Sequence, residues 1–176
     1  MLIDKYLPKY DFREFHSIKV ISHTDNVYQQ VLNCDLSQSW VIKLLFRIRG
    51  IPAGFSSIED ILRMGFIKLD EVPGEEIIFG MITNSPVFNG CRTITSGSEF
   101  ISRGEPDILK AVINFRVTED LLSQFTISTE TRVWCGSAGI KKRFRLYWLF
   151  VKPFSQIVRK EILKQVKKQL RSAGNL

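Results

Sequence analysis

Apolar and polar residues alternate through much of the chain, which is the two-residue period of β-strands with one buried face. The clearest strand is residues 109–117, where apolar side chains at every second position alternate with Lys110, Asn114 and Arg116. Pro73-Gly74 is a strong turn pair between two other alternating segments. In chain order, the strands are predicted at residues 13–21, 66–72, 75–82, 93–103, 109–117 and 123–135.

Apolar residues three or four positions apart predict short helices between the first and second strands. Each has a side chain near its start whose oxygen can accept a free first-turn N–H. The predicted caps and ends are Ser22 or Thr24 for a helix that begins at Asp25, Ser37 for a second helix that ends at Gly50, and Ser56 with Glu59 for one further turn.

A much longer helix is predicted over residues 140–171. Pro153 must kink or break it, since proline removes a backbone donor and clashes with the preceding turn. The order of strand, short helices, antiparallel strands and one long helix indicates an α+β fold in which the helix covers a curved sheet. The apolar stripe that is expected to face the sheet comprises Phe144, Tyr147, Trp148, Val151, Phe154, Ile157, Val158, Ile162, Val166 and Leu170.

Five segments of the chain also resemble a known family. They are residues 46–52 (FRIRGIP), 73–80 (PGEEIIFG), 128–133 (STETRV), 143–148 (RFRLYW) and 153–159 (PFSQIVR). These segments are similar to an uncharacterised bacterial group of the START-like or SRPBCC superfamily, which includes birch-pollen-allergen-like proteins and polyketide cyclases. The resemblance spans about residues 13–171. It implies a helix-grip fold, with a curved antiparallel sheet wrapped around a long, Pro-kinked C-terminal helix.

The resemblance also implies an internal cavity between the sheet and the long helix. In relatives this cavity holds sterols, lipids, polyketides or aromatic compounds, so a hydrophobic small molecule is the expected ligand. Thr129 and Thr131 would orient that ligand, or they are ordinary strand residues bonded to a neighbouring strand. Tyr147 needs a partner for its hydroxyl if it is buried. The expected lining residues are Phe79, Phe100, Ile113, Phe115, Thr129, Thr131, Phe144, Tyr147 and Trp148.

Glu130 and Arg132 are the candidates for catalysis, with Tyr147 as a further candidate, and the first two share one face of the last strand. A carboxylate held by a guanidinium can act as a general acid or base. Alternatively, the two residues form a salt bridge on the outer face of the sheet. Their neighbours Phe125, Ile127 and Val133 are on the opposite face of the strand, which is the face expected to point inward. Superfamily members include passive carriers, cyclases and hydratases. Three functions therefore stay open: a ligand-binding protein, a cyclase, dehydratase or hydrolase, and a structural or partner-binding module without a cavity.

The net charge of +7 is unevenly distributed along the chain. Residues 1–140 hold 14 basic and 17 acidic side chains, whereas residues 141–176 hold 11 basic residues and one acidic residue, Glu161. The basic residues of the long helix are interpreted as a solvated face, or as a surface that docks transiently on an anionic membrane. Nucleic acid is disfavoured as a partner because no recognised binding motif accompanies the charge.

The residues give little support for a metal site, a cofactor or a disulfide framework. His16 and His23 are the only histidines, and neither has ligands at a metal-binding spacing, so no metal and no cofactor is expected. The three cysteines are too few and scattered for a disulfide framework. Because the N-terminus lacks the pattern of a signal peptide and no apolar run is long enough to span a membrane, a cytoplasmic location is expected. Residues 1–12 are interpreted as an N-terminal arm and residues 13–172 as a single domain.

Overall fold

The computed structural model describes residues 1–23, 26–36, 39, 43, 47, 57–85, 91–121 and 123–173. Its elements follow in the order α1 (Leu2–Tyr6), β1 (Phe12–Ile21), α2 (Val27–Leu32), the 3-10 helix η2 (Ile58–Met64), β2 (Ile67–Val72), β3 (Glu76–Thr83), β4 (Cys91–Arg92), α4 (Gly97–Ser102), β5 (Leu109–Leu121), β6 (Gln124–Cys135) and α5 (Ala138–Ala173).

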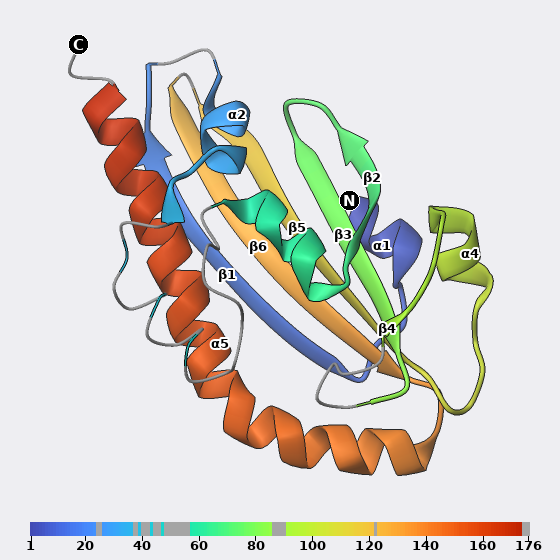
Figure 1. Ribbon diagram of the computed structural model, residues 1–176. Coiled ribbons are helices and arrows are strands. Elements are labelled where there is room, and N and C mark those ends of the chain that lie inside the picture. The colour runs from blue at the N-terminus through green and yellow to red at the C-terminus, as the bar shows by residue number, and fades with distance from the viewer. Residues whose placement is uncertain are drawn as a thin grey trace.

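The strands form one antiparallel sheet in the order β1-β6-β5-β3-β2, and β4 pairs with β3. The sheet is curved, and the long helix α5 runs across it beside β1 and β6 (Figure 1). The predicted α+β fold, with a curved antiparallel sheet and a long C-terminal helix, is confirmed. Gly74 has a positive φ of 86° in the predicted turn between β2 and β3, a conformation that glycine adopts without strain.

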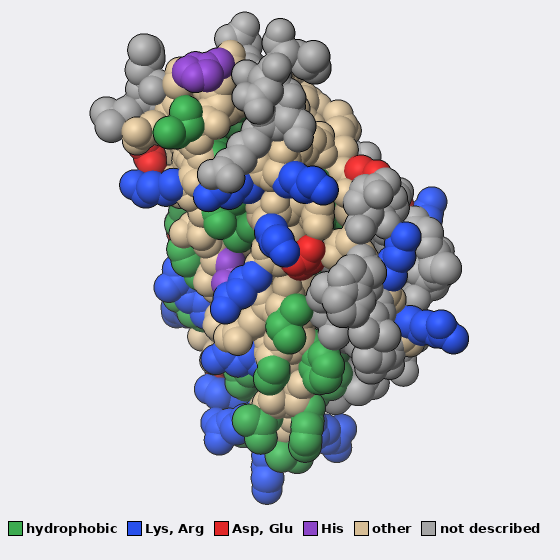
Figure 2. All heavy atoms as spheres, turned by 90° about the vertical axis from the view of Figure 1, so that its left-hand side faces the viewer, with side chains coloured by type: hydrophobic (Ala, Val, Ile, Leu, Met, Phe, Trp, Pro, Cys, Tyr) green, Lys and Arg blue, Asp and Glu red, His purple; other side chains and the backbone are tan. Residues whose placement is uncertain are grey.

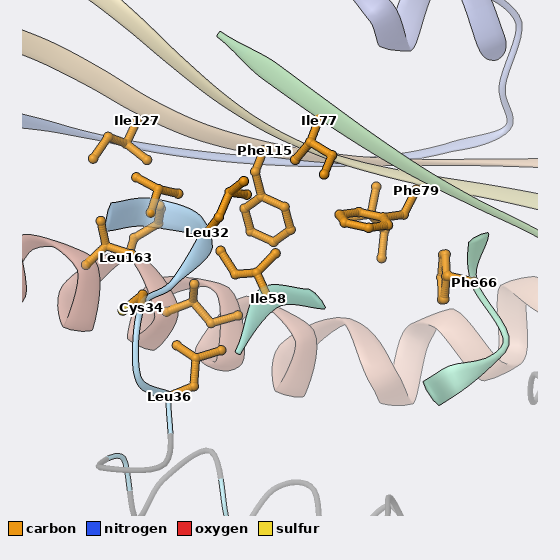
Figure 3. Packing of buried hydrophobic residues seen from close by; sticks show 14 of the residues in the cluster. Leu32, Cys34, Leu36, Ile58, Phe66, Ile77, Phe79, Phe115, Ile127 and Leu163 are labelled. Atoms are coloured by element: carbon orange, nitrogen blue, oxygen red, sulfur yellow. The ribbon is translucent and has the colours of Figure 1, made fainter. Parts of the chain in front are cut away.

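The inner face of the sheet is the face that α2, η2 and α5 cover. It carries the predicted alternating residues of β5, from Leu109 through Ile113 to Val117, all of which are buried. Figure 3 shows Phe115, Ile77 and Phe79 of the sheet pointing toward side chains of α2 and η2. These residues belong to one large apolar cluster, which also takes in the second half of α5.

The outer face of the sheet is also buried over β3 and much of β5, which the alternating pattern of β5 did not predict, whereas the outer-facing residues of β1 are exposed. The N-terminal arm folds back so that α1 packs against this face beside α4. Lys110 and Asn114 of β5 are therefore only 6% and 2% exposed. A polar residue in an alternating strand indicates solvent only when no distant segment covers it, and here residues far away in the sequence do so. The second cluster comprises Ile3, Tyr6, Leu7, Leu69, Ile78, Ile82, Ile94, Phe100, Ile108 and Val112.

The predicted strand over residues 93–103 is wrong, because this segment contains the helix α4. Ser96 caps α4 by accepting a hydrogen bond from the backbone N–H of Glu99 at 3.1 Å. The polar alternation of the segment resembled a strand, whereas the Ser-x-x-Glu spacing, which is a typical start of a helix, was the informative signal. The fully buried Phe100 anchors α4 to the outer face.

Two of the short helices begin later than predicted. Asn26, and not Ser22, caps α2, and Thr24 lies outside the described residues. The capping box of η2 pairs Ser57 with Asp60, one position after the predicted pair. The helix predicted from Ser37 to Gly50 lies largely outside the described residues.

The helix α5 extends over 36 residues, contains Pro153 and is sharply bent (Figure 1). Figure 2 views the side along which α5 runs, and Lys and Arg side chains are spread over it. The predicted inward stripe is correct for Phe144 and for Ile162 onward, but Phe154 and Ile157 are 38% and 47% exposed. Each helical residue turns by about 100°, which carries these two side chains away from the sheet.

The buried outer face predicts a large cost for shortening one of its side chains. Ile78→Ala should lower the free energy of unfolding by about 2–4 kcal/mol, since Ile78 is fully buried beneath the N-terminal arm. Ile21→Ala makes the same chemical change at an exposed position and should cost less than about 0.5 kcal/mol. Urea unfolding followed by circular dichroism measures both values, and equal small losses would contradict a buried outer face.

Candidate functional site

A group of polar side chains lies on the inner face between the sheet and α5. Pairing of β1 with β6 sets Glu14 opposite Thr131 and His16 opposite Thr129. Side chains of directly opposite residues lie on the same face of a sheet, so these four point toward α5. Arg159 of α5 lies on the same side of the sheet and donates hydrogen bonds to Thr129 and Thr131. We call these five residues the arginine cluster.

Arg159 is the central residue of the arginine cluster. Its guanidinium donates hydrogen bonds to the hydroxyl oxygens of Thr129 and of Thr131, the latter at 2.5 Å, and it lies 6.0 Å from the ring centre of Phe115. Burial lowers the pKa of Arg159 to about 10, although the nearby carboxylate of Glu14 acts in the opposite direction. Among the described residues, no carboxylate is close enough to form an ion pair with it. A cation is therefore buried with only neutral hydrogen-bond partners.

Glu14 and His16 form the second part of the arginine cluster. The Nε2 atom of His16 lies 2.9 Å from Oε1 of Glu14, and both side chains are largely buried. The other carboxylate oxygen of Glu14, Oε2, is buried without a hydrogen-bond partner. A buried acceptor that lacks a donor costs free energy, so this oxygen is available to a donor group from a ligand or a water.

The rest of the inner face is apolar beside this cluster. Sheet pairing places Ile113 next to Thr131 and Phe115 next to Thr129, and Phe79 follows in β3 beside Ile113. At the level of Thr129 and Thr131, the inner face thus changes from polar at β1 and β6 to apolar at β5 and β3. An amphiphilic molecule has the same division into a polar end and an apolar body.

Most of the predicted lining residues are on this face. Phe79, Ile113 and Phe115 belong to the inner cluster, and Thr129 and Thr131 bind Arg159. The helix residues follow the same pattern, because Phe144 is fully buried and both Tyr147 and Trp148 pack against the inner cluster. That a cavity opens among these side chains stays a prediction.

Phe100 is not part of this arrangement, and its assignment to the inner lining is corrected. It lies in α4 on the outer face, where Nζ of Lys110 approaches its ring centre to 5.1 Å. The misassigned strand over residues 93–103 caused this error, because a strand residue can point into the space under the long helix whereas α4 lies on the other side of the sheet.

Glu130 and Arg132 lie on the outer face, away from the arginine cluster. Nε of Arg132 and Nε of Arg13 each approach Oε1 of Glu130 to 2.7 Å. Arg132 also binds Asp4 at 2.8 Å and the carbonyl oxygen of Leu7 at 3.1 Å. The pair therefore ties the N-terminal arm to β6, and it does not contribute a carboxylate to the space between the sheet and α5.

The environment of Glu130 sets its protonation. Burial by itself raises the pKa of this carboxyl group, but the hydrogen bonds from Arg13 and Arg132 outweigh that effect and lower it below the ordinary value of 4.5. For the Arg132 guanidinium, burial lowers the pKa and the hydrogen bonds to Glu130 and Asp4 raise it by more. Both groups are thus held in their charged forms, as expected of a structural ion pair.

The sequence pattern did not single out Arg159, Glu14 or His16 as site residues. A signal was present, since Glu14 and His16 are two residues apart in a predicted strand and share a face. Arg159 also falls among the inward apolar residues Ile162 and Val166 of the long helix, whereas a solvated arginine belongs on the opposite side.

A hollow lies at one end of the sheet. It is a cleft of about 470 Å³ between the start of α2, the turn before β3 and the adjoining ends of β5 and β6. Its floor and walls are partly charged, and none of the predicted lining residues belongs to it. The residues around it are Asn26, Val27, Tyr28, Gly74, Glu75, Arg116, Val117, Thr118, Glu119 and Phe125.

Comparisons with known proteins leave the family open. No protein-family model and no curated protein sequence matches this chain. The crystal structure of a conserved protein from Geobacillus kaustophilus is similar over 92% of this chain and 97% of that chain, with 9% sequence identity and a TM-score of 0.39. A similarity of this size assigns neither a fold family nor a function.

The outer ion pairs predict a stability that depends on pH. Because the pKa of Glu130 in the folded protein is below its ordinary value of 4.5, its contribution is complete above about pH 4.5 and is lost as pH falls through the folded-state pKa. Glu130→Gln leaves two arginines without their carboxylate and should cost roughly 3 kcal/mol at pH 7. The difference from wild type should shrink in acid.

Urea unfolding at pH 7 and at decreasing pH below 4.5 tests this expectation. Glu119→Gln, which changes an exposed carboxylate of β5, is the matched control and should shift stability by less than about 0.5 kcal/mol. A loss for Glu130→Gln that stays constant across the pH range would show that the charge of Glu130 is not what stabilises the arm.

Proposed function

We propose that this protein binds a hydrophobic small molecule with an acidic end group between the sheet and α5. The observation that carries the proposal is Arg159, a buried guanidinium that has no ion-pair partner among the described residues and lies at the border of a large apolar face. The acidic group of the ligand would bind Arg159, and its apolar body would lie toward Phe115 and Phe79.

Burial of a charged group costs free energy. A guanidinium without an anionic partner loses several kcal/mol of hydration, and the hydroxyls of Thr129 and Thr131 return only part of it. Buried ionisable groups with shifted pKa values are concentrated at functional sites. A carboxylate, phosphate or sulfonate would pair with Arg159, and a hydroxyl of the same ligand could donate to the free Oε2 of Glu14.

The resemblance to the START-like superfamily supports the same function. We infer membership from the segments named above and from the arrangement of a curved antiparallel sheet with a long, bent C-terminal helix. Cavities between these two elements hold lipids, sterols, polyketides or aromatic compounds in that superfamily. Phe79, Ile113, Phe115, Phe144, Tyr147 and Trp148 would be the apolar lining here.

A matched pair of fluorescent probes tests the acidic end group. 8-Anilinonaphthalene-1-sulfonate and N-phenyl-1-naphthylamine share their aromatic body, but only the first carries an anion. Arg159→Met should weaken binding of the sulfonate about ten-fold, because it removes a charge-assisted hydrogen bond, and should leave the neutral probe within about two-fold. Arg145→Met, on the exposed side of α5, is the control and should change neither affinity.

Two results would contradict the proposal. One is equal sulfonate affinity in the wild type and in Arg159→Met, with both proteins folded by circular dichroism. The other is the absence of probe binding together with native mass spectra that show no retained small molecule. Arg159→Met replaces the guanidinium by an apolar side chain, and the circular dichroism spectra of both proteins show whether the variant folds, which keeps the first comparison interpretable.

The pair Glu14–His16 favours a second candidate, an acid–base enzyme of hydrolase or dehydratase type. A carboxylate 2.9 Å from an imidazole nitrogen orients that ring, and the arrangement is common in general acid–base catalysis. In a screen with p-nitrophenyl esters, turnover should be lost in His16→Gln and retained in His23→Gln, which changes an exposed histidine. Equal turnover in the two variants would exclude this role for His16.

A further inference from the structure

The outer side of α5 carries a second apolar surface that no described element covers. Leu146, Leu149 and Phe150 are 62%, 69% and 71% exposed, and Phe154 and Ile157 continue the same line. Their positions are spaced by three or four residues, so they form one stripe on the helix. We call Leu146, Leu149, Phe150, Pro153, Phe154 and Ile157 the outer stripe.

The outer stripe lies opposite the residues with which α5 packs on the sheet. Phe144, Val158 and Ile162 face inward, and about 100° per residue places Leu146, Leu149 and Phe150 on the far side of the helix. Single exposed apolar residues are ordinary, whereas a contiguous group of large ones on a helix indicates a contact surface. The helix is therefore apolar on two sides over residues 144–158.

Basic side chains border the outer stripe. Lys142 and Arg143 precede it, Lys160 and Lys164 follow it, and all four are exposed. Residues 131–160 contain no Asp or Glu. In Figure 2, hydrophobic side chains gather on the lower part of the face along which α5 runs, and Lys and Arg side chains border them. An apolar centre between cations is the pattern of a helix that lies in the headgroup region of an anionic membrane.

We propose that the outer stripe docks this protein on an anionic lipid bilayer. Leu149 and Phe150 would insert among the acyl chains, and Lys142, Arg143, Lys160 and Lys164 would contact lipid phosphates. The helix would lie in the plane of the membrane, because no helix among the described residues is long and apolar enough to cross it. Docking on this side leaves the inner side of α5 on the sheet.

The charges favour a membrane over a second copy of the chain as the occupant. Two copies that met through this stripe would bring together two segments that are each rich in Lys and Arg and lack carboxylates over residues 131–160. Like charges at close range oppose such a dimer, whereas a bilayer with anionic headgroups neutralises them. The outer stripe and the basic residues that border it are not part of the proposed ligand site, so each proposal can fail alone.

Flotation with vesicles tests the docking surface. The full chain should bind vesicles of phosphatidylcholine and phosphatidylglycerol, bind at least about ten-fold more weakly to phosphatidylcholine alone, and be released by 0.5 M salt. The double variant Leu149→Ser and Phe150→Ser should bind anionic vesicles at least about ten-fold more weakly, since two large apolar side chains no longer enter the bilayer. Lys142→Gln with Arg143→Gln should weaken binding and reduce its dependence on salt.

A matched control distinguishes the effect of the outer stripe from the effect of exposed apolar side chains elsewhere on the protein. Phe15→Ser and Ile21→Ser remove exposed apolar side chains from β1, far from the stripe in sequence, and should bind anionic vesicles like the wild type. Equal vesicle binding by the Leu149→Ser and Phe150→Ser variant would overturn the proposal. So would a wild-type dimer in analytical ultracentrifugation that this variant dissociates while vesicle binding is absent, because the stripe would then be an interface between copies.

Discussion

Both faces of the antiparallel sheet are buried over the central parts of β5 and β6, so polar side chains there must find hydrogen-bond partners inside the protein. On the outer face, Glu76 accepts hydrogen bonds from Asn114 and from the backbone N–H of Leu2, which holds the N-terminal arm in place. On the inner face, Thr129 and Thr131 accept hydrogen bonds from Arg159. The same requirement thus attaches the arm to one face and α5 to the other.

The two faces satisfy this requirement in different ways. The difference distinguishes the residues that stabilise the fold from the residues of the candidate site. Glu130 and Arg132 are fully paired, with two arginines and two acids in one network, so their charges are compensated within the chain. Arg159 is paired only with hydroxyls, although Glu14 is near enough to influence its pKa. A network of paired charges stabilises a fold, whereas a buried charge without an ion-pair partner leaves a place for a ligand of opposite sign.

The helix α5 contributes residues to both the interior and the surface of the protein. Its inward side completes the apolar cluster and supplies Arg159, and its outward side carries the exposed stripe between basic residues. A membrane-docked α5 would thus place the proposed ligand site directly beneath the lipid surface.

The alternation of apolar residues by itself determined most of the β-sheet and the inner face, because one-sided burial imposes a two-residue period that is local in sequence. It located β1, β2, β3, β5 and β6, and it grouped Thr129 with Ile127 on the face opposite Glu130. Only the tertiary structure decided that the N-terminal arm covers the outer face, that Phe100 lies there in α4, and that Arg159 reaches Thr129 across 30 positions of the chain. These outcomes depend on contacts between segments that are far apart in the sequence. The local pattern of apolar residues does not determine which distant segment will cover a face of the sheet, or which charged residue that segment will bury.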